Sequence, residues 1–220
     1  MLVKQNLIDF KKNIPKEVTL VAVSKTKPIS DILEAYEAGQ RVFGENKIQE
    51  MVNKYEALPK DIQWHMIGHL QSNKVKYMAH FVDLVHGVDS FKTLREINRQ
   101  AKKHYRVINC LLQAKIAKEE TKFGMGFNEI EEILQSDALA ELKNVKITGL
   151  MGMASFSADE KEVSDEFKSL KLFFDKLIAS GFEFNVLSMG MSGDYRLAID
   201  NGSNMIRVGS AIFGSRSYIA

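Results

Sequence analysis

The chain has 220 residues, of which 45% are hydrophobic and 26% charged, and 30 Lys and Arg against 28 Asp and Glu leave a formal net charge of +2. This composition is typical of a globular protein, and it excludes disordered, collagen-like and disulfide-rich classes and argues against nucleic-acid binding. No run approaches the roughly 18 apolar residues of a membrane span, and residues 1–12 carry charges where a signal peptide is apolar. The single cysteine, Cys110, lies in an apolar run and is predicted to be a buried small hydrophobe. We therefore expect a cytoplasmic protein without a membrane partner.

Short apolar, β-branched runs alternate with longer segments of helical period, which is the pattern of βα units around a parallel sheet. The expected strands are residues 19–24, 41–44, 63–67, 81–86, 107–114, 145–151, 185–188 and 204–208. Their number predicts a single α/β domain over residues 1–220, a (β/α)8 barrel of the TIM type. The alternative is an open doubly wound sheet, but its glycine fingerprint is absent after the first strand.

Helices are expected in the segments between these strands. An additional amphipathic helix over about residues 2–12 precedes the first strand, and we expect it to close the bottom of the barrel. Four polar residues are predicted to cap helices at their N-termini: Ser30, Ser90, Asn128 and Ser157.

Lys25 directly follows the first apolar strand, in the part of an α/β barrel where active sites are built. Partial desolvation there would lower the pKa of its amine and let it condense with a carbonyl compound as a Schiff base. A solvated lysine at a strand end is the simpler interpretation of this position alone. The assignment therefore depends on neighbouring groups.

Glycine and hydroxyl residues gather in the loops after the last two strands, where barrels frequently bind phosphate. These loops contain Ser192 within Gly-Met-Ser-Gly at 190–193, and Gly209 followed by Ser210. Two ordinary turns that use glycine would give the same pattern. A phosphate site beside a carbonyl-reactive lysine indicates pyridoxal 5′-phosphate (PLP), although a phosphosugar aldolase shares both features. Arg207 has the strand parity to point into the same mouth, which would place its guanidinium against the ring nitrogen of the cofactor.

Longer motifs are similar to those of one known family. They are the runs 21–25, 43–46 with 49–50, 64–74, 122–124, 187–192 with Asp194, and 206–214. In the same order and over nearly the whole chain, the sequence resembles the YggS/PROSC family of pyridoxal phosphate homeostasis proteins. The fold of that family is similar to the barrel domain of alanine racemase.

The resemblance implies PLP as cofactor and a site that contains Lys25, Asn46, Ser192, Arg207, Gly209 and Ser210. In this assignment the lysine forms the Schiff base, the two serines and Gly209 bind the phosphate, and the arginine lies against the pyridine nitrogen. His65 is a further predicted pocket residue, and no metal is expected because no cluster of acidic or cysteine residues accompanies it. The resemblance also implies a carrier that supplies or buffers PLP without an established turnover reaction. We expect a monomer that contacts PLP-dependent apo-enzymes transiently.

One feature of the residues themselves also favours a carrier. An arginine at the ring nitrogen keeps that nitrogen unprotonated, which weakens the electron sink that carbanion chemistry uses. We also expect no second domain of the kind that supplies a catalytic tyrosine in racemases of similar barrel fold. The alternatives are a PLP-dependent racemase-like enzyme, with Tyr195 as candidate acid or base, and a Schiff-base phosphosugar aldolase, which would need an acidic partner beside Lys25.

Overall fold

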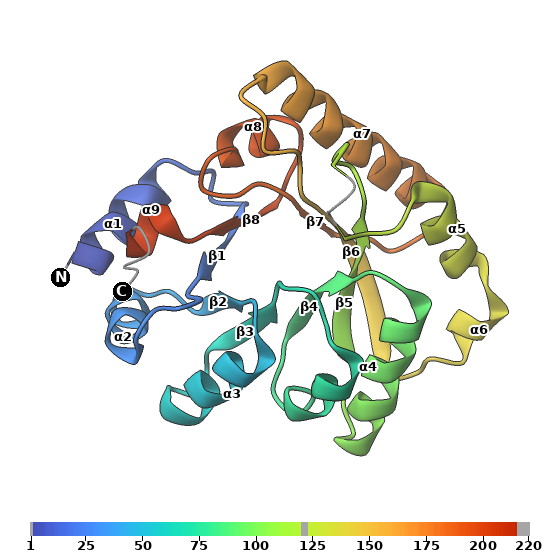
Figure 1. The fold of residues 1–220 in the computed structure, drawn as a ribbon, viewed down its shortest axis with the longest axis horizontal. Coiled ribbons are helices and arrows are strands. Elements are labelled where there is room, and N and C mark those ends of the chain that lie inside the picture. Colours follow the sequence, from blue (N-terminus) through green and yellow to red (C-terminus); the bar gives the residue numbers. More distant parts are fainter. Residues whose placement is uncertain (1, 120–122, 215–220) are drawn as a thin grey trace.

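The computed structural model describes residues 2–119 and 123–214, in which parallel strands form a closed barrel surrounded by helices (Figure 1). The strands are β1 (Thr19–Val23), β2 (Val42–Glu45), β3 (Gln63–Met66), β4 (Leu84–Val88), β5 (Ile108–Ala114), β6 (Val145–Gly152), β7 (Val186–Ser188) and β8 (Met205–Val208). They follow one another in sequence order, and β1 pairs in parallel with both β2 and β8. The predicted (β/α)8 barrel is confirmed, each predicted strand overlaps the observed one, and the open sheet is excluded.

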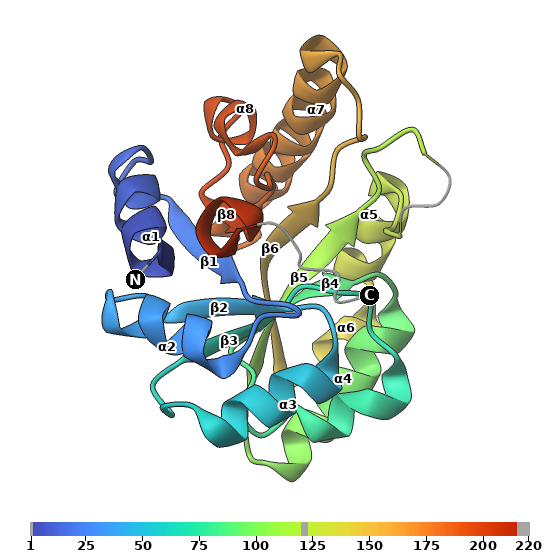
Figure 2. The same ribbon diagram turned by 60° about the vertical axis from the view of Figure 1, so that its left-hand side comes forward.

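The helices form a layer around the barrel (Figures 1 and 2). They are α1 (Leu2–Lys12), α2 (Ile29–Glu37), α3 (Ile48–Ala57), α4 (Phe91–Lys103), α5 (Phe127–Gln135), α6 (Asp137–Ala140), α7 (Glu160–Ala179), α8 (Tyr195–Asp200) and α9 (Ser210–Phe213), with the 3-10 helix η1 (Ser72–Tyr77) before β4. No helix in the described parts of the chain is both long enough and apolar enough to cross a membrane.

Only one of the four predicted helix caps is confirmed among these helices. The Ser90 side chain accepts a hydrogen bond from the Thr93 amide at 3.2 Å at the start of α4. The predicted caps at Ser30, Asn128 and Ser157 are wrong. Helix α2 begins directly after Pro28, whose fixed φ suits a helix start, and α5 begins after Gly126. At α7 the carboxylate of Asp159 takes the capping position predicted for the nearby serine.

Helix α1 is present as predicted, but it does not close the bottom of the barrel. It lies outside the barrel wall, packed against α2 and α9 (Figures 1 and 2), and buries Val3, Leu7 and Phe10. Asn6 Nδ2 also donates a hydrogen bond of 3.1 Å to the Ile212 carbonyl of α9. Since α9 is only one turn long, α1 supplies the apolar cover that a longer helix after β8 would give.

Apolar side chains form two separate layers. The outer layer lies between strands and helices and contains the largest buried side chains, including Trp64, Phe43 and Phe167. Cys110 is buried in this layer as predicted, and burial raises the pKa of its thiol. The inner layer lies inside the barrel, and its buried members are Val21, Leu84, Leu111, Met151 and Met205.

Candidate functional site

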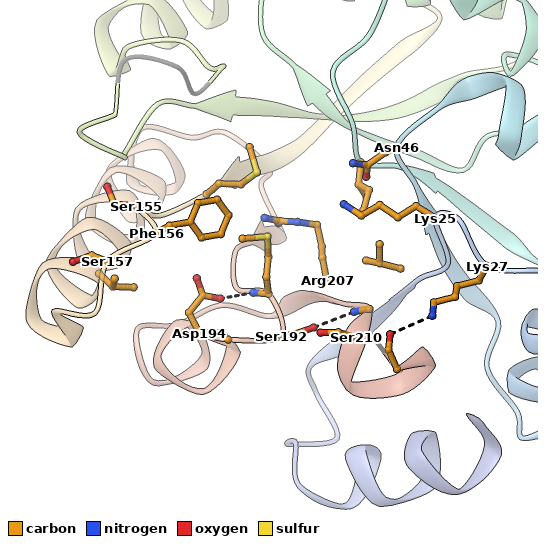
Figure 3. A pocket seen from close by; sticks show the side chains of 18 residues that line it. Lys25, Lys27, Asn46, Ser155, Phe156, Ser157, Ser192, Asp194, Arg207 and Ser210 are labelled. Atoms are coloured by element: carbon orange, nitrogen blue, oxygen red, sulfur yellow. Dashed lines mark hydrogen bonds between the residues drawn. The ribbon is translucent and has the colours of Figure 1, made fainter. Parts of the chain in front are cut away.

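A cavity of about 520 Å³ opens at the carboxyl ends of the strands, and we call it the mouth cavity (Figure 3). Six of the seven predicted site residues line it: Lys25, Asn46, Ser192, Arg207, Gly209 and Ser210. Lys25 and Asn46 follow β1 and β2, Ser192 lies in the loop after β7, and Ser210 begins α9 after β8. The closed barrel therefore brings together residues from both ends of the sequence.

The backbone around Lys25 is held on both sides. The carbonyl oxygen of Ser24 accepts a hydrogen bond of 2.7 Å from Lys54 Nζ, and the amide of Thr26 donates one of 2.6 Å to Glu50 Oε1. Thr26 has a φ of 64°, a left-handed conformation that residues other than glycine rarely adopt. These contacts hold a sharp turn directly after the lysine, so that Lys25 is carried by a restrained backbone.

A buried ion pair lies next to this turn. Lys54 Nζ is 2.7 Å from both Glu45 Oε1 and Glu50 Oε1, and Ser24 Oγ donates a hydrogen bond of 2.5 Å to the same Glu45 oxygen. Burial raises the pKa of Glu45 despite the nearby lysine. Sequence reasoning missed Lys54, because its spacing from Glu50 is that of an ordinary pair on a helix surface.

Arg207 is 4% exposed and is fixed by three hydrogen bonds. Nη1 donates to the Ser188 carbonyl at 2.9 Å and to its Oγ at 2.6 Å, and Nη2 donates to the Gly152 carbonyl at 2.9 Å. Burial lowers the pKa of Arg207 to about 10, while the charge of Asp194 opposes this shift. The guanidinium therefore stays a cation at neutral pH, held at the floor of the mouth cavity.

A hydrogen bond joins the loops after β7 and β8, which the sequence analysis assigned to one phosphate site. Ser192 Oγ accepts a hydrogen bond of 3.2 Å from the Gly209 amide. Within the first loop, Asp194 Oδ1 accepts one of 2.5 Å from the Met191 amide. Gly190 has a φ of 97°, and a Cβ there would lie 2.6 Å from a Cβ of α8, so this turn requires glycine.

The charges around the mouth cavity favour an anion. Lys25, Lys27 and Arg207 line it, together with the carboxylate of Asp194. Ser155 and Phe156 after β6 also line it, although the sequence did not mark them as site residues. Ser155 is held by Glu166, which accepts hydrogen bonds of 2.7 Å from its amide and from its hydroxyl.

The structure does not bring His65 or Tyr195 to the mouth cavity. His65 lies inside the barrel and lines a second cavity of about 490 Å³ where the strands begin, which we call the basal cavity. Because inward positions alternate along a strand, Ile67 reaches the mouth from β3 in its place. Burial lowers the pKa of His65 to about 3. The Tyr195 ring packs against Phe10 of α1, with ring centroids 4.8 Å apart.

Comparison with known proteins places this barrel in a family. Residues 2–217 match the family "Alanine racemase, N-terminal domain". The chain is 40% identical to the pyridoxal phosphate homeostasis protein of Vibrio alginolyticus over 209 residues, which are 93% of this chain and 89% of that protein. It is 38% identical to the one of Escherichia coli K12 over 208 residues, 93% and 88% of the two chains. The chain belongs to the pyridoxal phosphate homeostasis protein family.

Solved structures agree with membership of the pyridoxal phosphate homeostasis family. PipY of Synechococcus elongatus without PLP has a TM-score of 0.91 and 35% identity, covering 96% of this chain and all of that one, and its PLP-bound form has a TM-score of 0.87. An alanine racemase of Clostridium difficile is 16% identical with a TM-score of 0.80, covering 99% of this chain and 57% of that one, and shows a shared fold. The predicted family is thus confirmed, although Lys122 of one predicted motif lies outside the described residues.

Proposed function

We propose that the protein binds PLP in the mouth cavity, covalently through Lys25, and supplies or buffers this cofactor. The observation that carries the proposal is the convergence of Lys25, Arg207 and the Ser192–Gly209 loop pair on one cavity. The names of the relatives and the PLP-bound form of PipY support it.

The residues of the mouth cavity fit PLP group by group. PLP supplies an aldehyde that a lysine amine captures as a Schiff base, a pyridine nitrogen and a phosphate. Lys25 is the amine, Arg207 donates toward the ring nitrogen, and Ser192, Gly209 and Ser210 offer hydroxyl and amide groups to the phosphate. Asn46 lines the wall beside the lysine. The volume of about 520 Å³ lies within the usual range of small-molecule pockets.

The same residues favour holding PLP over turning a substrate over. Arginine has donors and no acceptor, so Arg207 leaves the ring nitrogen unprotonated and the electron sink weak. Tyr195 was the candidate acid or base of a racemase-like enzyme, but its ring packs against α1 and not in the mouth cavity, which argues against that role. The aldolase alternative needs an acidic partner for Lys25, and the nearby Glu45 is instead bonded to Lys54 and Ser24.

Borohydride reduction tests the lysine assignment. Incubation with PLP should give a visible absorption band, and reduction followed by peptide mapping should place the cofactor on Lys25. Lys25→Ala should abolish both signals. Lys27→Ala is the matched control, because this lysine also lines the mouth cavity while its Nζ donates to the Phe213 carbonyl at 2.8 Å. An adduct on Lys27 would refute the proposal.

The absence of turnover is tested by NMR of amino acids in deuterium oxide. The loaded protein should not exchange the α-proton faster than free PLP does. Exchange that depends on the protein and disappears in Lys25→Ala would establish the racemase-like alternative instead. Monomeric state, cytoplasmic location and transient contact with apo-enzymes stay predictions that this experiment does not address.

A further inference from the structure

A chain of hydrogen bonds crosses the inside of the barrel from the basal cavity to the mouth cavity, and we call it the interior chain. His65 Nδ1 lies 3.0 Å from His86 Nε2, and His86 Nδ1 lies 3.1 Å from Ser188 Oγ. Arg207 Nη1 lies 2.6 Å from the same hydroxyl. All four side chains are buried. They come from β3, β4, β7 and β8, so the interior chain joins opposite walls of the barrel.

The arginine at one end sets the direction of every hydrogen bond in the interior chain. A guanidinium only donates, so Ser188 Oγ accepts from Arg207. The other hydrogen-bond partner that the described residues give this hydroxyl is Nδ1 of His86, which therefore receives its single hydrogen. A neutral imidazole with an accepting Nδ1 carries its proton on Nε2. His86 therefore donates to Nδ1 of His65, which in turn carries its own proton on Nε2.

Burial keeps both histidines in the neutral form that this direction requires. Desolvation lowers the pKa of His86 well below its ordinary value, and the positive charge of Arg207 lowers it further. Arg207 is thus the cation of the interior chain. The accepting atoms of its neighbours, Ser188 Oγ and then His86 Nδ1, lie on the side of each group that faces Arg207. The acceptors that the structure gives Arg207 are two backbone carbonyls and the Ser188 hydroxyl.

We propose that His86 is a positioning residue for the cofactor ring, which acts by orienting the Ser188 hydroxyl so that its lone pair holds Arg207. Without an acceptor at His86, the Ser188 hydrogen has lost its partner inside the barrel, and the hydroxyl can turn away from the guanidinium. Arg207 would then keep only its carbonyl contacts, and its aim at the ring nitrogen would loosen. This inference rests on the proposed PLP site.

The first experiment uses the protein without PLP and reads the two histidine tautomers by nitrogen-15 NMR. We expect both His65 and His86 to carry the proton on Nε2 at neutral pH. Ser188→Ala should change the Nδ1 signal of His86, because this nitrogen loses its donor. A proton found on Nδ1 of His86 would overturn the proposal whether or not the protein binds PLP.

The second experiment compares variants with PLP labelled at the ring nitrogen. His86→Phe should shift the ring-nitrogen signal and weaken PLP binding about tenfold, the effect of one hydrogen bond to a charged group. His86→Gln, which offers an acceptor to Ser188 and a donor to His65, should restore most of the wild-type signal. Leu111→Val is the matched control, since it trims the inner layer without touching the interior chain.

The outcomes separate the two proposals. If the wild-type protein does not bind PLP, the proposed function fails, and the tautomers still decide the orientation of the interior chain. If the wild-type protein binds PLP but His86→Phe leaves the ring-nitrogen signal unchanged, the positioning role of His86 is wrong and the proposed function stands. An equal shift in Leu111→Val would also overturn it, because general loosening of the inner layer would then be the cause.

Discussion

The two sides of the barrel wall differ in what they bury. The outer layer is filled by large apolar side chains such as Trp64 and Phe167, whereas the inside of the barrel buries histidine, serine and arginine among smaller apolar residues. Burial of large apolar surface is the main source of folding free energy, and a buried polar group adds little beyond its hydrogen bonds. The outer layer therefore supplies the stability that lets the inside of the barrel be organised around a charged group.

The largest expected effect on stability comes from the outer layer. Phe167→Ala in α7 should lower the free energy of unfolding by about 3–5 kcal/mol, because it leaves a cavity where a fully buried ring packs. Urea unfolding measures this loss, and PLP affinity of the folded protein should stay unchanged. Leu172→Ala, at a 62% exposed position of the same helix, should change stability by less than about 0.5 kcal/mol. A parallel loss of PLP affinity in Phe167→Ala would contradict the separation of the two layers.

The inside of the barrel should make the protein sensitive to acid. The pKa of His65 is lowered to about 3 and that of His86 is also lowered, so below about pH 6.5 the unfolded chain binds more protons than the folded one. Above the unfolded pKa, the two histidines make their full contribution to the free energy of unfolding. As the pH falls from there toward the folded pKa of each histidine, the free energy of unfolding should decrease by about 1.4 kcal/mol per pH unit for each of them. Urea unfolding at a series of pH values checks this, and His86→Phe should have a shallower slope. Equal slopes in the two proteins would show that His86 is not buried as a neutral group.

The smallest effect is expected at the rim of the outer layer. Ser90→Ala should lower the free energy of unfolding by about 1 kcal/mol, because the N-cap hydrogen bond of α4 is lost. PLP absorption should not change. Ser30→Ala is the matched control: α2 begins without a side-chain cap, so thermal unfolding of this variant should match wild type. A comparable loss of stability in Ser30→Ala would show that Ser30 caps α2 after all.

The barrel and most of its mouth could be predicted because both depend on local patterns. Apolar runs of strand length recur with helical segments between them. In a (β/α)8 barrel the residues that follow each strand lie at the end of the barrel where the mouth cavity forms. Lys25 and the glycine-containing loops were found in this way, and Arg207 was found from its parity on the last strand. The position of α1 was not predictable, since it depends on how little of the wall the short α9 covers.

The sequence analysis misplaced His65 and missed His86 and Lys54, because their roles depend on the height of a side chain inside the barrel and on contacts with residues of other elements. Strand parity predicts that His65 faces inward, but it does not say at which height inside the barrel the side chain lies. His86 has the same strand parity as the inward-facing Leu84, but nothing in the sequence shows that its ring contacts His65 and Ser188 of other strands. The Lys54–Glu45 pair joins a helix to the strand before it, and nothing in the sequence marks that lysine as buried.

The barrel closes along a seam where the first and last strands pair, with Val21 opposite Arg207. Lys25 lies at the end of one side of this seam and Arg207 on the other, so the proposed PLP site is complete only after β8 has been made and has paired with β1. During synthesis on the ribosome, Lys25 of β1 would be made long before Arg207 of β8, the residue that completes the proposed site. Binding of the ligand to residues on both sides of the seam would then stabilise the pairing of β1 with β8. This is the strand pairing whose two members are not consecutive in the sequence.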